Sequence, residues 1–125
     1  MTQRHDVLLA AWESCKDRLP VTFDAFEEAT RGWDATPVYA SGCLVGAILQ
    51  NGVEIHACIK PEGFGKWLSR RVLRETIGAT VKMHGRAITK VQQGNKVGDA
   101  FVRRLGFTPV STSGGIVTYE VTHGY

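Results

Sequence analysis

The chain has 125 residues, which is enough for one compact domain and leaves little for a second. Hydrophobic residues make up 43 % and charged residues 22 %, so a folded core is expected and disorder is not. No apolar run approaches the roughly 20 residues needed to cross a bilayer, and the N-terminus lacks a signal-type apolar stretch. We therefore expect a cytoplasmic protein without a membrane span, folded as a single domain over residues 1–125.

The net charge of +3 is mild, but most of the excess lies in one segment. The cations of this segment are Lys60, Lys66, Arg70, Arg71, Arg74, Lys82, Arg86 and Lys90. A nucleic-acid surface usually adds interleaved aromatic residues, so nucleic acid is an unlikely partner. A phosphate-bearing small ligand suits the segment better, and a solvated helix face is the alternative.

The three cysteines, Cys15, Cys43 and Cys58, show no paired spacing. A disulfide framework or a zinc site needs closer clustering, and zinc needs histidines among the ligands. We expect reduced thiols and no metal site.

The first third of the chain predicts two helices. Apolar residues recur with helical spacing over residues 5–18, and Leu19-Pro20 ends that pattern. Thr22 is a suitable N-cap for a second helix that reaches Arg31-Gly32. Residues 33–37 predict a turn.

Three strands of an antiparallel meander follow, over residues 38–40, 43–49 and 53–59. Asn51-Gly52 is a strong hairpin signal because both residues tolerate positive φ. Alternation in the third strand predicts two faces. One face carries Glu54, His56, Cys58 and Lys60; the other carries Val53, Ile55, Ala57 and Ile59.

A glycine-bearing turn over residues 61–65 leads to a basic helix over residues 67–82, with Leu68, Val72, Leu73 and Ile77 as its buried stripe. A strand over residues 87–91 must pair in parallel with the third strand, because a helix separates them.

Asn95 then leads a helix over residues 96–105, with Val97, Phe101 and Leu105 inward and Gly106 as its C-terminal glycine. Strands over residues 107–110 and 116–121 close a hairpin. The order α-α-β-β-β-α-β-α-β-β predicts an α+β domain with a mixed central sheet and helices on both faces.

The turn after the third strand is the first candidate site. Unpaired backbone N–H groups and the positive end of a helix dipole stabilise phosphate in such a place. The segment Ile59-Lys60-Pro61-Glu62-Gly63-Phe64-Gly65-Lys66-Trp67 resembles the pyrophosphate loop of the GCN5-related N-acetyltransferase (GNAT) family. In one register, residues 60–65 fit the family form R/Q-x-x-G-x-G/A, with Lys60 in place of the leading arginine or glutamine. In a second register, Phe64 stands at the arginine and Trp67 at a small residue, as in a version associated with phage-encoded members.

A second motif supports the resemblance. The family often shows an asparagine, a tyrosine seven positions later, and Gly-Phe at positions eleven and twelve. Asn95 and Gly106-Phe107 match this frame, whereas the tyrosine position is Val102, next to Phe101. In the family the asparagine holds the pantetheine arm and the tyrosine protonates the departing thiolate, so this chain departs from the family at that step.

The resemblance implies a GNAT fold, acetyl-CoA as cofactor and an amine as acceptor. On β-strand geometry, Glu54 and His56 are the candidate bases for the amine, and a surface or packing role is the alternative for each. The cofactor-binding candidates are Cys58, Ile59, Lys60, Gly63, Phe64, Gly65, Lys66, Trp67, Asn95 and Phe101. Cys58 is expected as a packed thiol rather than a nucleophile, and Tyr119 is a substitute proton donor.

A catalytically inactive copy of the fold is the alternative function. Val102 and Trp67 favour it, and the resemblance to phage members implies a structural or interaction component of a phage or prophage, such as an internal virion protein. Its partners would then be other phage proteins, and its location the host cytoplasm or the virion.

Overall fold

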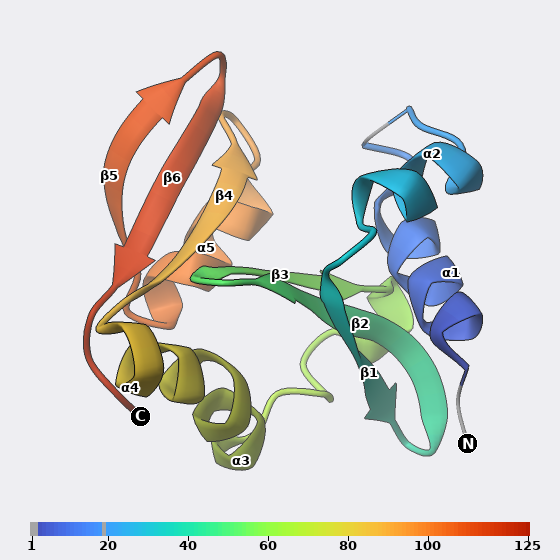
Figure 1. Cartoon of the computed structure of the whole chain (residues 1–125), viewed down its shortest axis with the longest axis horizontal. Helices are drawn as coiled ribbons and strands as arrows, with labels where there is room; N and C mark the ends of the chain where they lie inside the picture. Colours follow the sequence, from blue (N-terminus) through green and yellow to red (C-terminus); the bar gives the residue numbers. More distant parts are fainter. Residues whose placement is uncertain (1–2, 19) are drawn as a thin grey trace. The chain divides into compact units, whose positions relative to one another are not determined.

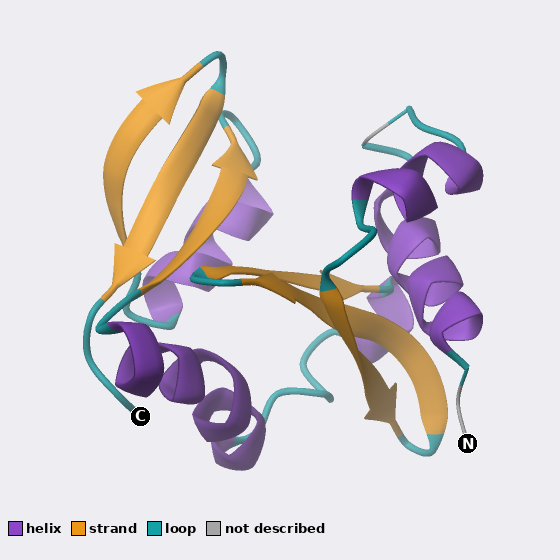
Figure 2. Cartoon of the chain, viewed as in Figure 1, coloured by secondary structure: helices purple, strands orange, loops and turns teal. Residues whose placement is uncertain are grey.

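A computed structural model describes residues 3–18 and 20–125. The predicted role of Leu19 in ending the first helix lies outside the described residues. Figure 1 labels the elements, and Figure 2 separates helices from strands. The elements are α1 (Arg4–Cys15), α2 (Phe23–Ala29), β1 (Asp34–Ala40), β2 (Cys43–Asn51), β3 (Glu54–Ile59), a 3₁₀ turn (Pro61–Gly63), α3 (Arg70–Leu73), a π-helical segment (Arg74–Gly78), α4 (Ala79–His84), β4 (Ala87–Gln92), α5 (Lys96–Arg104), β5 (Thr108–Ser113) and β6 (Ile116–Val121).

The strands form one mixed sheet with the order β1-β2-β3-β4-β6-β5. β1 pairs antiparallel with β2, and β6 pairs antiparallel with both β4 and β5. β3 pairs in parallel with β4, with Glu54 opposite Ile88. The predicted α+β fold, the element order and the parallel pairing across the helical connection are therefore confirmed.

The chain divides into two compact units. The N-terminal unit comprises Met1–Asn51 and His56–Leu68, and the C-terminal unit comprises Gly52–Ile55 and Ser69–Tyr125. β3 contributes residues to both. Within the described residues, no helix combines the length and apolar character that a membrane span requires.

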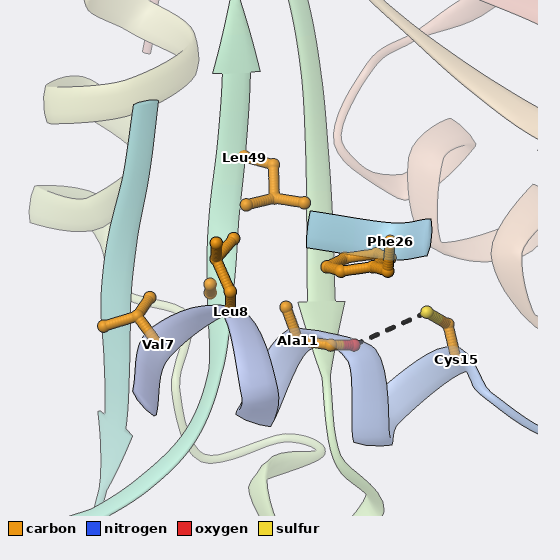
Figure 3. Close-up of a cluster of buried hydrophobic side chains, with 7 residues drawn as sticks. Val7, Leu8, Ala11, Cys15, Phe26 and Leu49 are labelled. Carbon is orange, nitrogen blue, oxygen red and sulfur yellow. Dashed lines mark hydrogen bonds between the residues drawn. The ribbon is translucent and has the colours of Figure 1, made fainter. Parts of the chain in front are cut away.

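The core of the N-terminal unit forms where α1 packs on the sheet (Figure 3). Its buried members are Val7, Leu8, Ala11, Cys15, Phe26, Ala47 and Leu49. The α1 members recur at intervals of three and four residues, which places them on one side of a helix. That apolar stripe is removed from water against β2 and Phe26, and its burial fixes how α1 lies on the sheet.

The core of the C-terminal unit joins its helices to β4 and β6. Its buried apolar members are Ile55, Ile77, Val81, Ala87, Val91, Val102, Phe107, Tyr119 and Val121. The helical segments α3, π and α4 follow one another without a break from Arg70 to His84, and Gly85 ends them in the left-handed conformation (φ 82°).

Several predicted boundaries are wrong. The predicted turn at residues 33–37 is mostly strand, because β1 begins at Asp34. β1 is an edge strand, where Pro37 can lack an N–H donor without breaking the sheet. β5 continues to Ser113, three residues beyond the predicted end, because its polar residues pair with β6 while remaining exposed.

Two predicted helix faces also need correction. Leu68 precedes α3 and is exposed, so it is not part of a buried helical stripe. Val97 was predicted to face inward but is 74 % exposed, and Val102 is the buried residue of α5. Val97 lies on the solvent side of α5, whereas Gly98 in the same turn approaches the buried Val91.

Candidate functional site

The two candidate bases on β3 have different surroundings. The Glu54 carboxylate Oε1 lies 3.5 Å from Lys90 Nζ on β4, so it is paired with a cation. The His56 ring contacts the Trp33 ring, with 5.8 Å between centroids and a 40° tilt. His56 is half-buried, and this aromatic contact fixes one side of its ring.

Cys58 is a packed thiol. It lies against the core cluster of the N-terminal unit, and burial raises the pKa of its thiol to about 12. The thiolate is the nucleophilic form, so this side chain is inert at neutral pH. Ile59 is buried, and its Cγ2 leaves no room for a side chain at Gly63.

The glycine turn combines a packed glycine with an open one. A β-carbon at Gly63 would lie 2.7 Å from Val45 Cγ2 and 2.9 Å from Ile59 Cγ2, so only glycine fits. Gly65 has a φ of +75° and no heavy atom near a notional β-carbon. The first glycine lets the turn pack on the sheet, and the second reverses the chain direction in open space.

Three backbone donors in and beside the turn are used locally. The N–H of Gly63 donates to the Lys60 carbonyl (2.9 Å), that of Phe64 to Pro61 (3.1 Å) and that of Lys66 to Gly63 (3.0 Å). The prediction of a turn with freely available amides is therefore wrong for these three positions. A 3₁₀ turn satisfies its own donors, which the spacing of glycines could not reveal.

The side chains of the turn are accessible. Phe64 is 55 % exposed, and Lys66 is exposed as well. Lys60 is less exposed, with its Nζ 3.9 Å from Glu62 Oε2. The turn therefore presents one aromatic ring and one exposed lysine to solvent.

The helix begins three residues later than predicted. It starts at Arg70 rather than Trp67, because the Ser69 side chain accepts a hydrogen bond from the Val72 N–H (3.2 Å) and caps it. The Leu73 N–H donates to the Ser69 carbonyl (3.0 Å), which is the first hydrogen bond within the helix. The N–H groups of Arg70 and Arg71 come before this bond, so the helix itself offers them no carbonyl. Trp67 is half-buried in the segment that leads to this cap.

Asn95 is the N-cap of α5, as its position in the sequence predicted. Its Oδ1 accepts a hydrogen bond from the Gly98 N–H at 3.1 Å. Phe101 is half-buried on the same helix, and Val102, at the tyrosine position of the motif, is buried. No proton donor is therefore present at that position.

Tyr119 belongs to a polar network that the sequence did not predict. Its hydroxyl donates to Asp99 Oδ1, which also accepts from Arg103 Nε at 2.9 Å. This hydrogen bond lowers the pKa of Asp99 and raises the pKa of Tyr119. The hydroxyl is committed to a carboxylate, so Tyr119 is a poor substitute proton donor.

The sequence also did not predict a cavity of about 490 Å³ in the N-terminal unit. It is lined by residues of α1 and α2 and by the segment that leads into β1, including Trp33. Trp33 was assigned to a turn, and no local pattern connects it with His56, 23 positions away. Within the described residues, no group of three or more His, Cys, Asp or Glu side chains is arranged for a metal ion.

No protein-family model and no curated protein sequence matches the chain. Its structure is similar to the ribosomal-protein-S18-alanine N-acetyltransferase of Escherichia coli, with a TM-score of 0.70 and 16 % identity over 99 % of this chain and 92 % of that one. It is also similar to the ribosomal-protein-alanine N-acetyltransferase of Brucella melitensis (TM-score 0.66, 14 % identity, 98 % of both chains). The PaiA N-acetyltransferase of Thermoplasma acidophilum, solved with coenzyme A, matches with a TM-score of 0.58 and 18 % identity over 98 % of this chain and 81 % of that one. The chain therefore has the fold of the GCN5-related N-acetyltransferases.

Proposed function

We propose that this protein is an acetyl-CoA-dependent N-acetyltransferase that acts on an amine and works as one domain over residues 1–125. The observation that carries the proposal is the shared fold, with its parallel pair of β3 and β4 and a capped helix after the β3 turn. One neighbour of the same fold was solved with coenzyme A.

The start of the helix favours the second register of the pyrophosphate motif. Phosphate is stabilised by amides at a helix N-terminus, so the last motif residue must adjoin the helix. In the first register the motif ends at Gly65, five positions before Arg70. In the second register the six-residue motif starts at Phe64 and so ends at Ser69, which is the N-cap of the helix. We therefore assign the diphosphate contact to the amides that follow Ser69, with Arg70 adding positive charge.

His56 is the better candidate base. Acetyl transfer requires the amine nitrogen to lose a proton, to attack the thioester carbonyl carbon and to expel the thiolate as the C–S bond breaks. The Glu54 carboxylate is engaged by Lys90, with 3.5 Å between Oε1 and Nζ, so it is less available to the amine than His56. The Val102 side chain has no acidic proton to donate, and the Tyr119 hydroxyl is hydrogen-bonded to Asp99. The departing thiolate therefore takes its proton from water.

A second candidate function is favoured by Val102 and Trp67, the two departures from the family motifs. Without a proton donor at Val102, a copy of the fold can serve as a non-catalytic structural or interaction part, such as a component of a phage particle. This candidate predicts no turnover of acetyl-CoA.

Calorimetry with coenzyme A tests the binding claim. We expect saturable binding to the wild-type protein, and loss of roughly tenfold or more in affinity in Arg70→Glu, because a carboxylate replaces the positive charge beside the diphosphate. Arg104→Glu is the matched control, since it makes the same charge reversal at an exposed arginine of the same unit, at the end of α5. Its affinity should be unchanged.

Absence of heat with millimolar coenzyme A would overturn the proposal. Release of free thiol from acetyl-CoA in the presence of primary amines then separates the two candidate functions. Turnover that falls in His56→Ala supports the transferase, whereas coenzyme A binding without any turnover supports the non-catalytic candidate.

A further inference from the structure

Trp33 is anchored just before β1 by the turn that ends α2. In this turn, Gly32 takes the left-handed conformation with a φ of +85°. The Trp33 N–H then donates to the Thr30 carbonyl at 3.0 Å, and the Thr30 hydroxyl donates to the Phe26 carbonyl at 2.9 Å. These bonds tie the Trp33 backbone to the end of α2, in the segment that leads from α2 into β1 (Figure 1).

The Trp33 side chain is also restrained by packing. It is half-buried and packs against the core cluster of the N-terminal unit, and Cys58 on β3 packs against the same cluster. Successive side chains of a strand point to opposite faces, so His56 lies on the same face of β3 as Cys58. The fold therefore brings Trp33 and His56, which are 23 positions apart, to the same face of the sheet.

The indole of Trp33 touches the imidazole of His56. Their ring centroids are 5.8 Å apart with a tilt of 40°, and both residues belong to one compact unit. The second side-chain torsion of a histidine is broad, so the histidine by itself does not select one ring orientation. A neighbouring ring that is fixed by its backbone and by the core restricts that rotation.

The orientation of this imidazole matters for a proton-removing role. A base acts only where its nitrogen reaches the proton that it removes, and a displacement of about 1 Å can cost about 100-fold in rate. A side chain that carries chemistry is therefore best supported by a rigid neighbour. Within the N-terminal unit, Trp33 meets that requirement for His56.

We propose that Trp33 is a positioning residue, whose indole holds the His56 imidazole in the orientation that removes the proton of the acceptor amine. Trp33 acts through His56 and takes no proton itself. This inference rests on the proposed function, because it concerns the candidate base of that transfer.

The ring contact is tested by NMR spectroscopy of the His56 ring protons, whose resonances are assigned by their loss in His56→Ala. The ring current of an adjacent indole displaces these resonances. We expect them to move in Trp33→Leu and to stay in place in Trp12→Leu. Trp12 is the matched control, because its half-buried indole packs against the same cluster but contacts Phe23, with 6.0 Å between centroids.

The positioning role is tested by the kinetics of thiol release from acetyl-CoA with primary amines. We expect Trp33→Leu to lower kcat about tenfold and to leave the KM for acetyl-CoA unchanged, because only the base is misoriented. Trp33→Phe keeps an aromatic contact and should restore kcat to within about threefold of the wild type. Trp12→Leu should leave kcat unchanged. In a His56→Ala background, Trp33→Leu should cause no further loss.

Three results would overturn the inference: His56 resonances that do not move in Trp33→Leu, an equal loss of kcat in Trp12→Leu, or a further loss of kcat in the His56→Ala background. Trp33→Met keeps an apolar side chain without a ring, and it replaces Trp33→Leu if that variant does not fold. The two proposals fail separately. Full turnover in Trp33→Leu removes only this inference. A wild-type protein without turnover removes the proposed function, and the His56 resonances then decide whether Trp33 orients the ring.

Discussion

Gly46 on β2 lies where the neighbouring strand leaves no space for a side chain. A β-carbon there would be 2.0 Å from the Cys58 carbonyl oxygen and 2.9 Å from Ile59 Cα. The register of β1 against β2 shifts at the same place, between Val38 and Tyr39, which marks a β-bulge. The register shift and the tight contact at Gly46 lie beside Cys58 and Ile59, two of the candidate cofactor residues.

We expect Gly46→Ala to lower the free energy of unfolding by about 3 kcal/mol, because the added methyl group meets backbone atoms that cannot rotate away. Urea denaturation measures this change. Gly124→Ala is the control, since nothing lies within 4 Å of a β-carbon at Gly124, and its unfolding should be unaffected. A Gly46→Ala protein as stable as the wild type would contradict the close approach of β2 and β3.

Single residues also show where local patterns were sufficient. Asn95 was predicted as an N-cap from its place before a helical pattern, and it caps α5. Gly106 was predicted as the glycine after that helix and has a φ of +98°. Both depend on neighbours within a few positions, which the sequence displays directly.

At the scale of elements, Tyr119 joins the last strand to the last helix. Its hydroxyl donates to Asp99 on α5, and Arg103 on the same helix lies over its ring, with 5.7 Å from Cζ to the centroid. The ring itself is buried. The pair therefore sets how α5 lies against β6, and it also closes one side of the surface around Asn95.

Tyr119→Phe should lower the free energy of unfolding by about 1.5 kcal/mol, because it removes a hydrogen bond to a charged group and keeps the buried ring. A double-mutant cycle with Asp99→Asn measures the coupling. The effect of Tyr119→Phe should be smaller in the Asp99→Asn background. Equal effects in both backgrounds would show that the two side chains act independently.

The start of the basic helix illustrates why element boundaries were less predictable. Apolar and basic residues continue from Trp67 into the helix, so periodicity alone extends it upstream. The boundary is set by one hydrogen bond from the Val72 N–H to Ser69 Oγ. Since Ser69 also resembles an ordinary surface serine, only the structure identifies it as the cap.

At the scale of the whole molecule, β3 belongs to both compact units. Its first residues group with the C-terminal unit and His56–Leu68 groups with the N-terminal unit. Separation of the units would interrupt a continuous strand. We therefore propose that the two units unfold together, as one domain.

The tryptophans make this proposal testable. Trp12, Trp33 and Trp67 all lie in the N-terminal unit, so tryptophan fluorescence follows that unit, whereas far-UV circular dichroism follows both. We expect urea transitions with the same midpoint and slope by the two methods. A dichroism transition that continues after the fluorescence change is complete would indicate two independently folding units.

The sequence by itself determined the order of elements, the parallel return of β4 and the cap of α5, because each depends on periodicity, turn residues or near neighbours. Only the tertiary structure decided that three amides at the turn are bonded locally, that Glu54 pairs with Lys90, and that the Trp33 ring contacts His56. These contacts join residues distant in the chain or depend on backbone geometry. Their formation is set by how the strands and helices pack, which no local pattern encodes.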